Sequence, residues 1–233
     1  DFADRKLYIA DGHHRYETAL NYRNYCRENG ISKPGDPQDF QMIYLVDMEH
    51  PGLVVFPTHR LVRDLPNFDK EAVLEKCSEF FYIDEKEGTD TMEEDLKKLY
   101  DEGKKAFGFY CGKGEWFLLT LKNIDFMSQM LPNVSKASQS LDVSVLHTLI
   151  LEKIFGIDKE NMAKQINLTY TKFFTEAIDG VDKGEFQCSF VLNPTRVTEI
   201  RDVAAAGEKM PQKSTYFYPK MITGMVMNNL GVD

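Results

Sequence analysis

The sequence has few cysteines, and they lie far apart. The four, Cys26, Cys77, Cys111 and Cys188, show neither the paired spacing of zinc ligands nor the density of a disulfide scaffold. We therefore expect four reduced thiols. Long apolar runs are also missing, and no basic start leads into an apolar segment. We accordingly expect neither a membrane span nor a secretory signal, and we predict a cytoplasmic protein.

The sequence also lacks an excess of basic residues. The chain has 28 Lys and Arg against 37 Asp and Glu, which gives a net charge of -9, and no basic stripe offsets it. Such a surface repels nucleic-acid phosphate, so we expect a small-molecule partner and no DNA or RNA. No internal repeat is visible. The 233 residues, 42% of them hydrophobic, suffice for one large domain or two small ones, while the oligomeric state is left open.

The N-terminal part predicts a strand, a tight turn and a helix. Residues 6–10 are typical of a buried strand, Gly12 breaks it, and a helical pattern follows to about Asn29, with Gly30 as its C-cap. Residues 40–46 and 52–56 are rich in β-formers around a polar turn, which predicts a hairpin in the same sheet.

A second α+β block is predicted after residue 68. We predict helices over 69–80, 91–102, 141–155, 171–178 and 195–205, strands over 81–84, 106–110, 116–121, 165–170 and 185–192, and a polar loop over 127–140. The predicted fold class is α+β, with mixed sheets and packed helices. We place one domain over 1–66 and a second over 67–233.

The turn Asp11-Gly12-His13-His14-Arg15 is the strongest candidate site. It lies where the predicted strand ends and the helix begins, so unpaired N–H groups and the helix dipole favour an anion there. Gly12 permits close backbone approach, Arg15 offers a planar fork of donors, and the histidines can donate hydrogen bonds or assist proton transfer. Alternatively, Asp11 only caps the helix and the histidines pack or face solvent.

The run from Ile9 to Tyr16 resembles the phosphate-binding box of the ParB/sulfiredoxin superfamily. In that superfamily Gly-Glu-Arg-Arg or Gly-Cys-His-Arg opens a helix and binds nucleotide phosphates, and the match falls on Gly12, His13, His14 and Arg15. The resemblance implies binding of ATP or ADP. His13 stands where sulfiredoxin requires cysteine, so sulfinic-acid reduction is excluded.

A longer set of segments resembles the family of unknown function numbered 1015. It comprises residues 9–16, 56–60, 141–147 and 210–220. The resemblance implies that this sequence is the C-terminal part of a longer protein. The family is also similar to ParB-like free serine kinases, whose proposed catalytic glutamate precedes the phosphate box. Nothing here matches that glutamate, so we expect this chain alone to be inactive as a kinase.

Two further segments supply candidate ligand contacts. Thr58, His59 and Arg60 close the predicted second hairpin strand, so their side chains could project from a sheet edge toward the turn, or serve only the fold. Lys213 lies in the segment 210–220, which suits a ligand loop but equally an edge strand. Lys213 beside hydroxyl residues is typical of phosphate contacts, although the Gly-rich approach of a P-loop is missing.

Together these features predict a nucleotide-dependent phosphotransferase that acts on a small hydroxylated metabolite. Arg15, His14 and the turn amides would neutralise the phosphates with help from Arg60 and Lys213, and His13 or His59 would relay the proton. A Mg²⁺ ion would bridge the phosphates through Asp11, directly or through water. The alternatives are a non-catalytic nucleotide-binding switch and a structural or interaction module.

Overall fold

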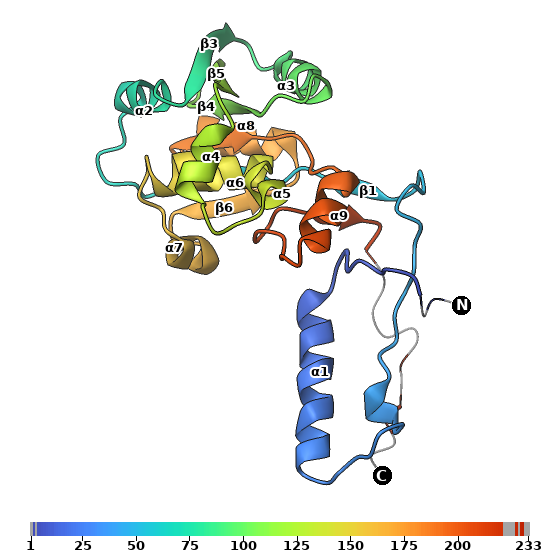
Figure 1. Cartoon of the computed structure of the whole chain (residues 1–233). Coiled ribbons are helices and arrows are strands. Elements are labelled where there is room, and N and C mark those ends of the chain that lie inside the picture. The colour runs from blue at the N-terminus through green and yellow to red at the C-terminus, as the bar shows by residue number, and fades with distance from the viewer. Residues whose placement is uncertain (1, 3, 221–226, 228, 231–233) are drawn as a thin grey trace. The chain divides into compact units, whose positions relative to one another are not determined.

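The protein has the predicted α+β fold, with antiparallel sheets and packed helices (Figure 1). The computed structural model describes residues 2, 4–220, 227 and 229–230. The chain divides into two compact units, of which the smaller comprises Asp1–Val54 with Phe217–Asp233 and the larger Val55–Tyr216. Residues 55–66, which the sequence analysis groups with the N-terminal region, therefore lie in the larger unit.

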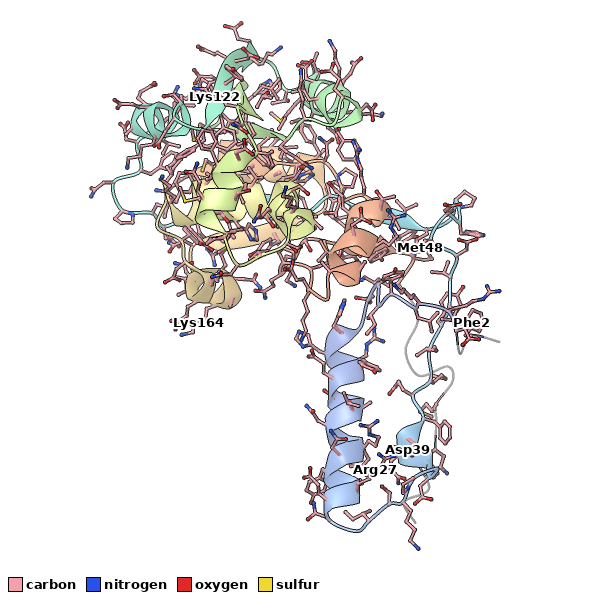
Figure 2. All side chains as sticks on the ribbon, in the orientation of Figure 1. Phe2, Arg27, Asp39, Met48, Lys122 and Lys164 are labelled. Atoms are coloured by element: carbon pink, nitrogen blue, oxygen red, sulfur yellow. The ribbon has the colours of Figure 1, made fainter. Side chains whose placement is uncertain are left out.

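The smaller unit is built on the long helix α1 (His13–Glu28), followed by the short 3-10 helix η1 (Pro37–Asp39). Helix α1 ends as predicted, because Asn29 caps it and Gly30 adopts a left-handed φ of 69°. Figure 2 shows Arg27 and Asp39 facing each other, and the guanidinium Nη2 donates to both carboxylate oxygens at 2.7 Å. This ion pair ties the last turn of α1 to η1.

Two strands predicted for the N-terminal part do not form. Residues 6–10 and 40–46 have no strand structure, although both runs are rich in β-formers. Residues 40–46 are exposed, so they bury no face on which a strand could be stabilised. The predicted hairpin is wrong because β1 (Val54–Phe56) pairs with β8 (Tyr216–Tyr218), a partner distant in sequence.

The larger unit contains a six-stranded antiparallel sheet with the order β3-β5-β4-β7-β2-β6. Its strands are β2 (His59–Val62), β3 (Phe81–Glu87), β4 (Ala106–Tyr110), β5 (Glu115–Leu121), β6 (Leu168–Thr171) and β7 (Cys188–Val191). The two strands predicted over 106–110 and 116–121 form β4 and β5, which pair as a hairpin around Gly112 and Gly114.

The helices of the larger unit mostly follow the sequence pattern. They are α2 (Lys70–Cys77), α3 (Met92–Asp101), α4 (Asp125–Met130), α5 (Lys136–Gln139), α6 (Asp142–Val145), the π-helix η2 (Leu146–Glu152), α7 (Lys159–Lys164), α8 (Phe174–Asp182) and α9 (Val197–Ala205). The predicted polar loop over 127–140 is wrong in part, because α4 and α5 form there. Met127 is buried, and the Ser135 hydroxyl caps α5 by accepting a bond from the Ser138 amide.

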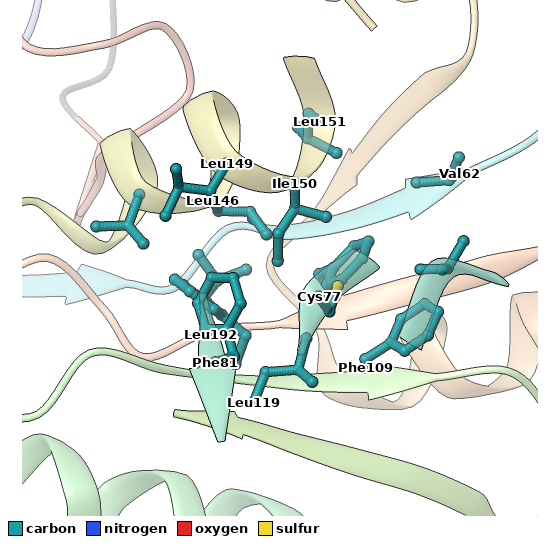
Figure 3. Packing of buried hydrophobic residues seen from close by; sticks show 14 of the residues in the cluster. Val62, Cys77, Phe81, Phe109, Leu119, Leu146, Leu149, Ile150, Leu151 and Leu192 are labelled. Carbon is teal, nitrogen blue, oxygen red and sulfur yellow. The ribbon is translucent and has the colours of Figure 1, made fainter. Parts of the chain in front are cut away.

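The two faces of the sheet carry separate hydrophobic clusters. Alternate strand residues point to opposite faces, so Phe107 and Phe109 of β4 pack in one cluster while Ala106 and Tyr110 pack in the other. Leu146, Leu149 and Ile150 of η2 pack in the first cluster, with Phe109 and Leu119 of the strands (Figure 3). Helices α3 and α8 contribute to the second cluster. Fully buried side chains of this kind stabilise a domain by roughly 2–5 kcal/mol each relative to alanine.

Candidate functional site

The predicted phosphate turn forms the N-terminus of α1. Gly12 is the N-cap and has a left-handed φ of 84°, which favours glycine. No side chain caps this helix end within the described residues, and its first turn holds no acidic residue. The first backbone N–H groups of a helix have no intrahelical partner. The end of α1 therefore presents free donors at the positive pole of a 16-residue helix.

The Arg15 side chain folds back over Gly12. Its Nη2 lies 3.4 Å from Oδ2 of Asp11, and Nζ of Lys220 lies 3.3 Å from the same oxygen. A Cβ atom at Gly12 would approach the Arg15 guanidinium to 2.9 Å, so glycine also makes room for this side chain. The arrangement places two cations and one carboxylate beside the helix terminus.

The two histidines of the turn differ in exposure. The side chain of His14 is fully exposed, and its Nδ1 lies 3.7 Å from a carboxylate oxygen of Glu17. His13 is half-buried. Both histidines lie in the first turn of α1, together with Arg15. The five residues from Asp11 to Arg15 that the sequence analysis grouped therefore all lie at this helix end.

The turn does not fit a directly bound Mg²⁺ as it stands. The Asp11 carboxylate already contacts two cations, Arg15 and Lys220. Across the described part of the chain, no three His, Cys, Asp or Glu side chains cluster as metal ligands would. A Mg²⁺ ion is held in proteins by one or two carboxylates together with phosphates and water. Asp11 would have to release both cations before it could bind Mg²⁺.

His59 and Arg60 are not at a sheet edge, contrary to the sequence prediction. They lie on β2, which is hydrogen-bonded to β7 on one side and to β6 on the other. Both side chains are buried, and consecutive strand residues point to opposite faces. A single shared site for this pair is therefore excluded by the geometry of the strand.

His59 lines a cavity of about 290 Å³ together with Glu93, Tyr100 and Asn193. Its Nδ1 accepts a hydrogen bond from the Leu192 amide at 3.2 Å, so the ring proton resides on Nε2. Within the described chain, that buried Nε2–H has no partner. Burial, and next the charge of Arg60, lowers the pKa of His59 to about 4. His59 is therefore a neutral donor near pH 7.

Arg60 is fully buried on the opposite face of β2. Its Nη1 donates to the Thr58 carbonyl, and its Nη2 donates to the Lys213 carbonyl at 3.1 Å and contacts Nε2 of His147 at 3.2 Å. Tyr170 is its neighbour in the β2–β6 register, and the guanidinium carbon lies 5.4 Å from the centre of that ring. Burial lowers the pKa of Arg60 to about 10, so the guanidinium remains charged near neutral pH.

Lys213 contacts Arg60 through its backbone carbonyl and not through its ammonium group. The residue adopts a left-handed φ of 55° in a turn, its carbonyl accepts from Arg60, and it is exposed overall. The sequence analysis did not select His147 and Tyr170, which contact Arg60. His147 lies in the segment 141–147 that carries the family resemblance, which was the available signal. For Tyr170 only the strand pairing reveals the contact.

Comparison of the sequence with known protein families finds a match to one family. Residues 1–144 match the family described as "Protein of unknown function (DUF1015)". The match is shorter than the resemblance noted in the sequence, and the segment 210–220 lies beyond it. No curated protein matches the chain.

Several solved structures are similar to the chain at low identity. A conserved hypothetical protein from Pyrococcus furiosus is 19% identical with a TM-score of 0.45, over 90% of this chain and 68% of that one. A free serine kinase variant in complex with AMP is 15% identical with a TM-score of 0.47, over 93% and 70% of the two chains. The same kinase variant in complex with ADP is 15% identical with a TM-score of 0.47, over 90% of this chain and 66% of that one. The chain thus spans about two thirds of the length of these structures.

The described part of the structure contains no helix long and apolar enough to cross a membrane.

Proposed function

Since the chain belongs to the DUF1015 family, whose function is unknown, we propose that its turn at Asp11–Arg15 binds nucleotide phosphate. The observation that carries the proposal is the N-terminus of α1. It exposes backbone donors, has no capping side chain among the described residues, and places His13, His14 and Arg15 in the first turn. Such an end is complementary to an anion.

The electrostatics of the turn support this proposal. Cationic groups at a helix N-terminus are unfavourable, because they meet the positive end of the dipole. Two other helices show the opposite arrangement, since the acidic side chains of Asp69 and Asp158 cap α2 and α7. Arg15 and Asp11 are both more than half exposed, and an ion pair between exposed groups contributes little to stability. Arg15 can therefore exchange this partner for a phosphate at small cost.

We further propose phosphoryl transfer to a small hydroxylated metabolite as the reaction. The acceptor oxygen would bond to the terminal phosphorus while the bond to the bridging oxygen breaks, and the shortened nucleotide leaves. The hydroxyl proton would pass to an imidazole nitrogen of His13. Arg15, His14 and the turn amides would neutralise the charge on the phosphoryl oxygens, which is the main requirement of this chemistry.

Titration of the whole chain with ADP, AMP and ATP tests the proposal, for wild type and for Arg15→Ala. AMP and ADP are the nucleotides named for the free serine kinase structures, so they are the first probes. Arg23→Ala is the matched control, because Arg23 lies on the same helix and donates to the side chain of its neighbour Asn24. Binding that depends on Arg15 supports the proposal, and no binding by the wild type refutes it.

A non-catalytic nucleotide switch is the second candidate. It is favoured by one feature of the turn, because the Asp11 carboxylate already contacts Arg15 and Lys220 and so offers no open position for a metal that would assist phosphoryl transfer. An activity assay with ATP and a hydroxylated acceptor such as serine distinguishes this candidate from the kinase. A switch would bind nucleotide through Arg15 but would release no product.

A further inference from the structure

We propose that the larger unit holds a binding site for a small organic monocarboxylate, in the cavity beside Arg60, His147 and Tyr170. All lining residues of this site belong to the larger unit, and the proposal does not rest on nucleotide binding. Its ligand would place the carboxylate at His147 and Tyr170 and an apolar body against Leu131, Val134 and Met162.

The cavity has the size and lining of a small-molecule site. Its volume is about 550 Å³, within the range of about 300–1,000 Å³ that is usual for such sites. Most of its wall is apolar, and hydroxyl groups of Ser144 and Thr148 interrupt it. All lining residues belong to the larger unit, and they come from α4 to α7, β6 and the segment before β8.

A buried, unbalanced positive charge lies behind one wall. Arg60 is fully buried, and no carboxylate in the described chain lies within ion-pair distance of it. Its Nε is buried without an acceptor there. Two backbone carbonyls, a histidine and an aromatic ring stabilise the guanidinium, but none of them carries a negative charge. A buried charge without a counter-ion is costly, so an anion that binds beside it gains Coulomb energy.

His147 connects this charge to the cavity. A guanidinium has only donors, so Arg60 Nη2 donates and Nε2 of His147 accepts at 3.2 Å. The proton of the neutral ring therefore resides on Nδ1. Burial, and next the neighbouring Arg60, lowers the pKa of His147 well below its usual value, which keeps the ring neutral. His147 lines the cavity and supplies one N–H donor to a ligand.

Tyr170 supplies a second donor. Its hydroxyl is buried and has no hydrogen-bond partner among the described residues, although Tyr170 lines the cavity and its ring contacts Arg60. A buried hydroxyl without a partner costs free energy that a bound acceptor would recover. Two donors beside one buried cation match the two oxygens of a carboxylate.

The charges of the remaining wall indicate a monoanion. Lys159 and Lys209 are balanced in number by Glu152 and Glu208, so Arg60 provides the excess of one positive charge. Glu208 does not serve Arg60, because its carboxylate accepts from the amide and hydroxyl of Ser135 at 2.7 Å each and from the Ser138 hydroxyl. A phosphate dianion would leave one negative charge without a partner.

Calorimetric titration of the whole chain with benzoate and hexanoate tests this site, with benzamide, hexanamide and inorganic phosphate as comparison probes. We expect at least one carboxylate to bind at least tenfold more tightly than its amide and than phosphate. Tyr170→Phe removes only the unpartnered hydroxyl, so the fold should persist, and we expect carboxylate affinity to fall about tenfold or more. Tyr82→Phe, the same change on an exposed residue of β3, should leave affinity unchanged.

The site is refuted if neither carboxylate binds, if acid and amide bind equally, or if Tyr170→Phe binds like the wild type. Tighter binding of phosphate than of both carboxylates would also overturn the assignment to a monocarboxylate. A failure of nucleotides to bind bears only on the phosphate turn, because these probes contain no nucleotide.

Discussion

The Arg60 guanidinium donates a hydrogen bond to Nε2 of His147 across 3.2 Å, which joins an interior strand to the π-helix η2. The two residues are 87 positions apart in the sequence. The contact fixes the tautomer of His147 and keeps a positive charge beside the 550 Å³ cavity. His59 lies next to Arg60 on the opposite face of β2, and it is also buried, but in different surroundings.

Arg15→Ala should separate binding from stability. The change removes a cation from the positive end of α1, so the free energy of unfolding should stay constant or rise by a few tenths of a kcal/mol. A charge-assisted hydrogen bond to phosphate contributes roughly 1.5–3 kcal/mol, so nucleotide affinity should fall about ten- to more than a hundredfold. Calorimetric titration and chemical denaturation measure the two effects. Equal nucleotide affinity in a folded variant would contradict phosphate binding by Arg15.

Gly12→Ala and Gly30→Ala should destabilise the protein by similar amounts, but only Gly12→Ala should displace the Arg15 side chain. Both glycines have a left-handed φ, 84° and 69°, so alanine costs about 1–2 kcal/mol of backbone strain at either position. Only at Gly12 would the new Cβ also approach Arg15, to 2.9 Å, whereas nothing lies within 4 Å at Gly30. Denaturation curves of the two variants should show similar losses, because the exposed end of Arg15 can move away from the new Cβ atom. A nucleotide affinity reduced by Gly12→Ala and not by Gly30→Ala would support the turn as the site, and equal effects of both would argue against it.

Stability should fall as the pH decreases from about 6.5 to 4. The pKa of His59 is lowered to about 4 in the folded protein, so between these values the unfolded chain binds more protons than the native one. The stabilisation is therefore complete above pH 6.5 and is lost toward pH 4, with an upper limit of about 3 kcal/mol from His59.

The variant His59→Asn should flatten part of this pH dependence. Asparagine retains an acceptor for the Leu192 amide but does not titrate. His50→Asn is the matched control, because Nδ1 of the exposed His50 also accepts a backbone amide, that of Gly52. Urea denaturation at pH 7, 5.5 and 4.5 gives the comparison. The same slope in His59→Asn and wild type would show that His59 does not carry the effect.

The cysteines should react slowly with a thiol reagent in the native protein. All four are free, and Cys26, Cys77 and Cys188 are buried. Burial raises the pKa of Cys77 to about 12, and burial is also the main cause that raises that of Cys111 to about 12. The reactive thiolate is therefore scarce near pH 7. Labelling with and without urea measures this. Rapid native labelling of two or more cysteines would contradict it, as would a lower melting temperature in the presence of a reductant or zinc chelator.

Local features of the sequence determined the elements with strong local signals. The helix from His13 to Glu28 follows from its pattern and its flanking glycines, and the β4–β5 hairpin follows from two β-rich runs around Gly112 and Gly114. Caps and positive-φ glycines act within a few residues, so sequence alone reveals them. The turn at Asp11–Arg15 is a local feature of the same kind, because it begins helix α1 with Gly12 as the N-cap.

Tertiary structure decided the rest, because strand pairing and burial depend on partners far away in the chain. Residues 40–46 have strand composition but bury no face, whereas Val54–Phe56 pairs with Tyr216–Tyr218. His59 and Arg60 are neighbours in sequence, but the pleat of β2 sends them to opposite faces of the sheet. Arg60 meets His147 and Tyr170 only because β2 pairs with β6 and η2 packs on that face. No local pattern contains these contacts, since each joins residues that are about 90 to 110 positions apart.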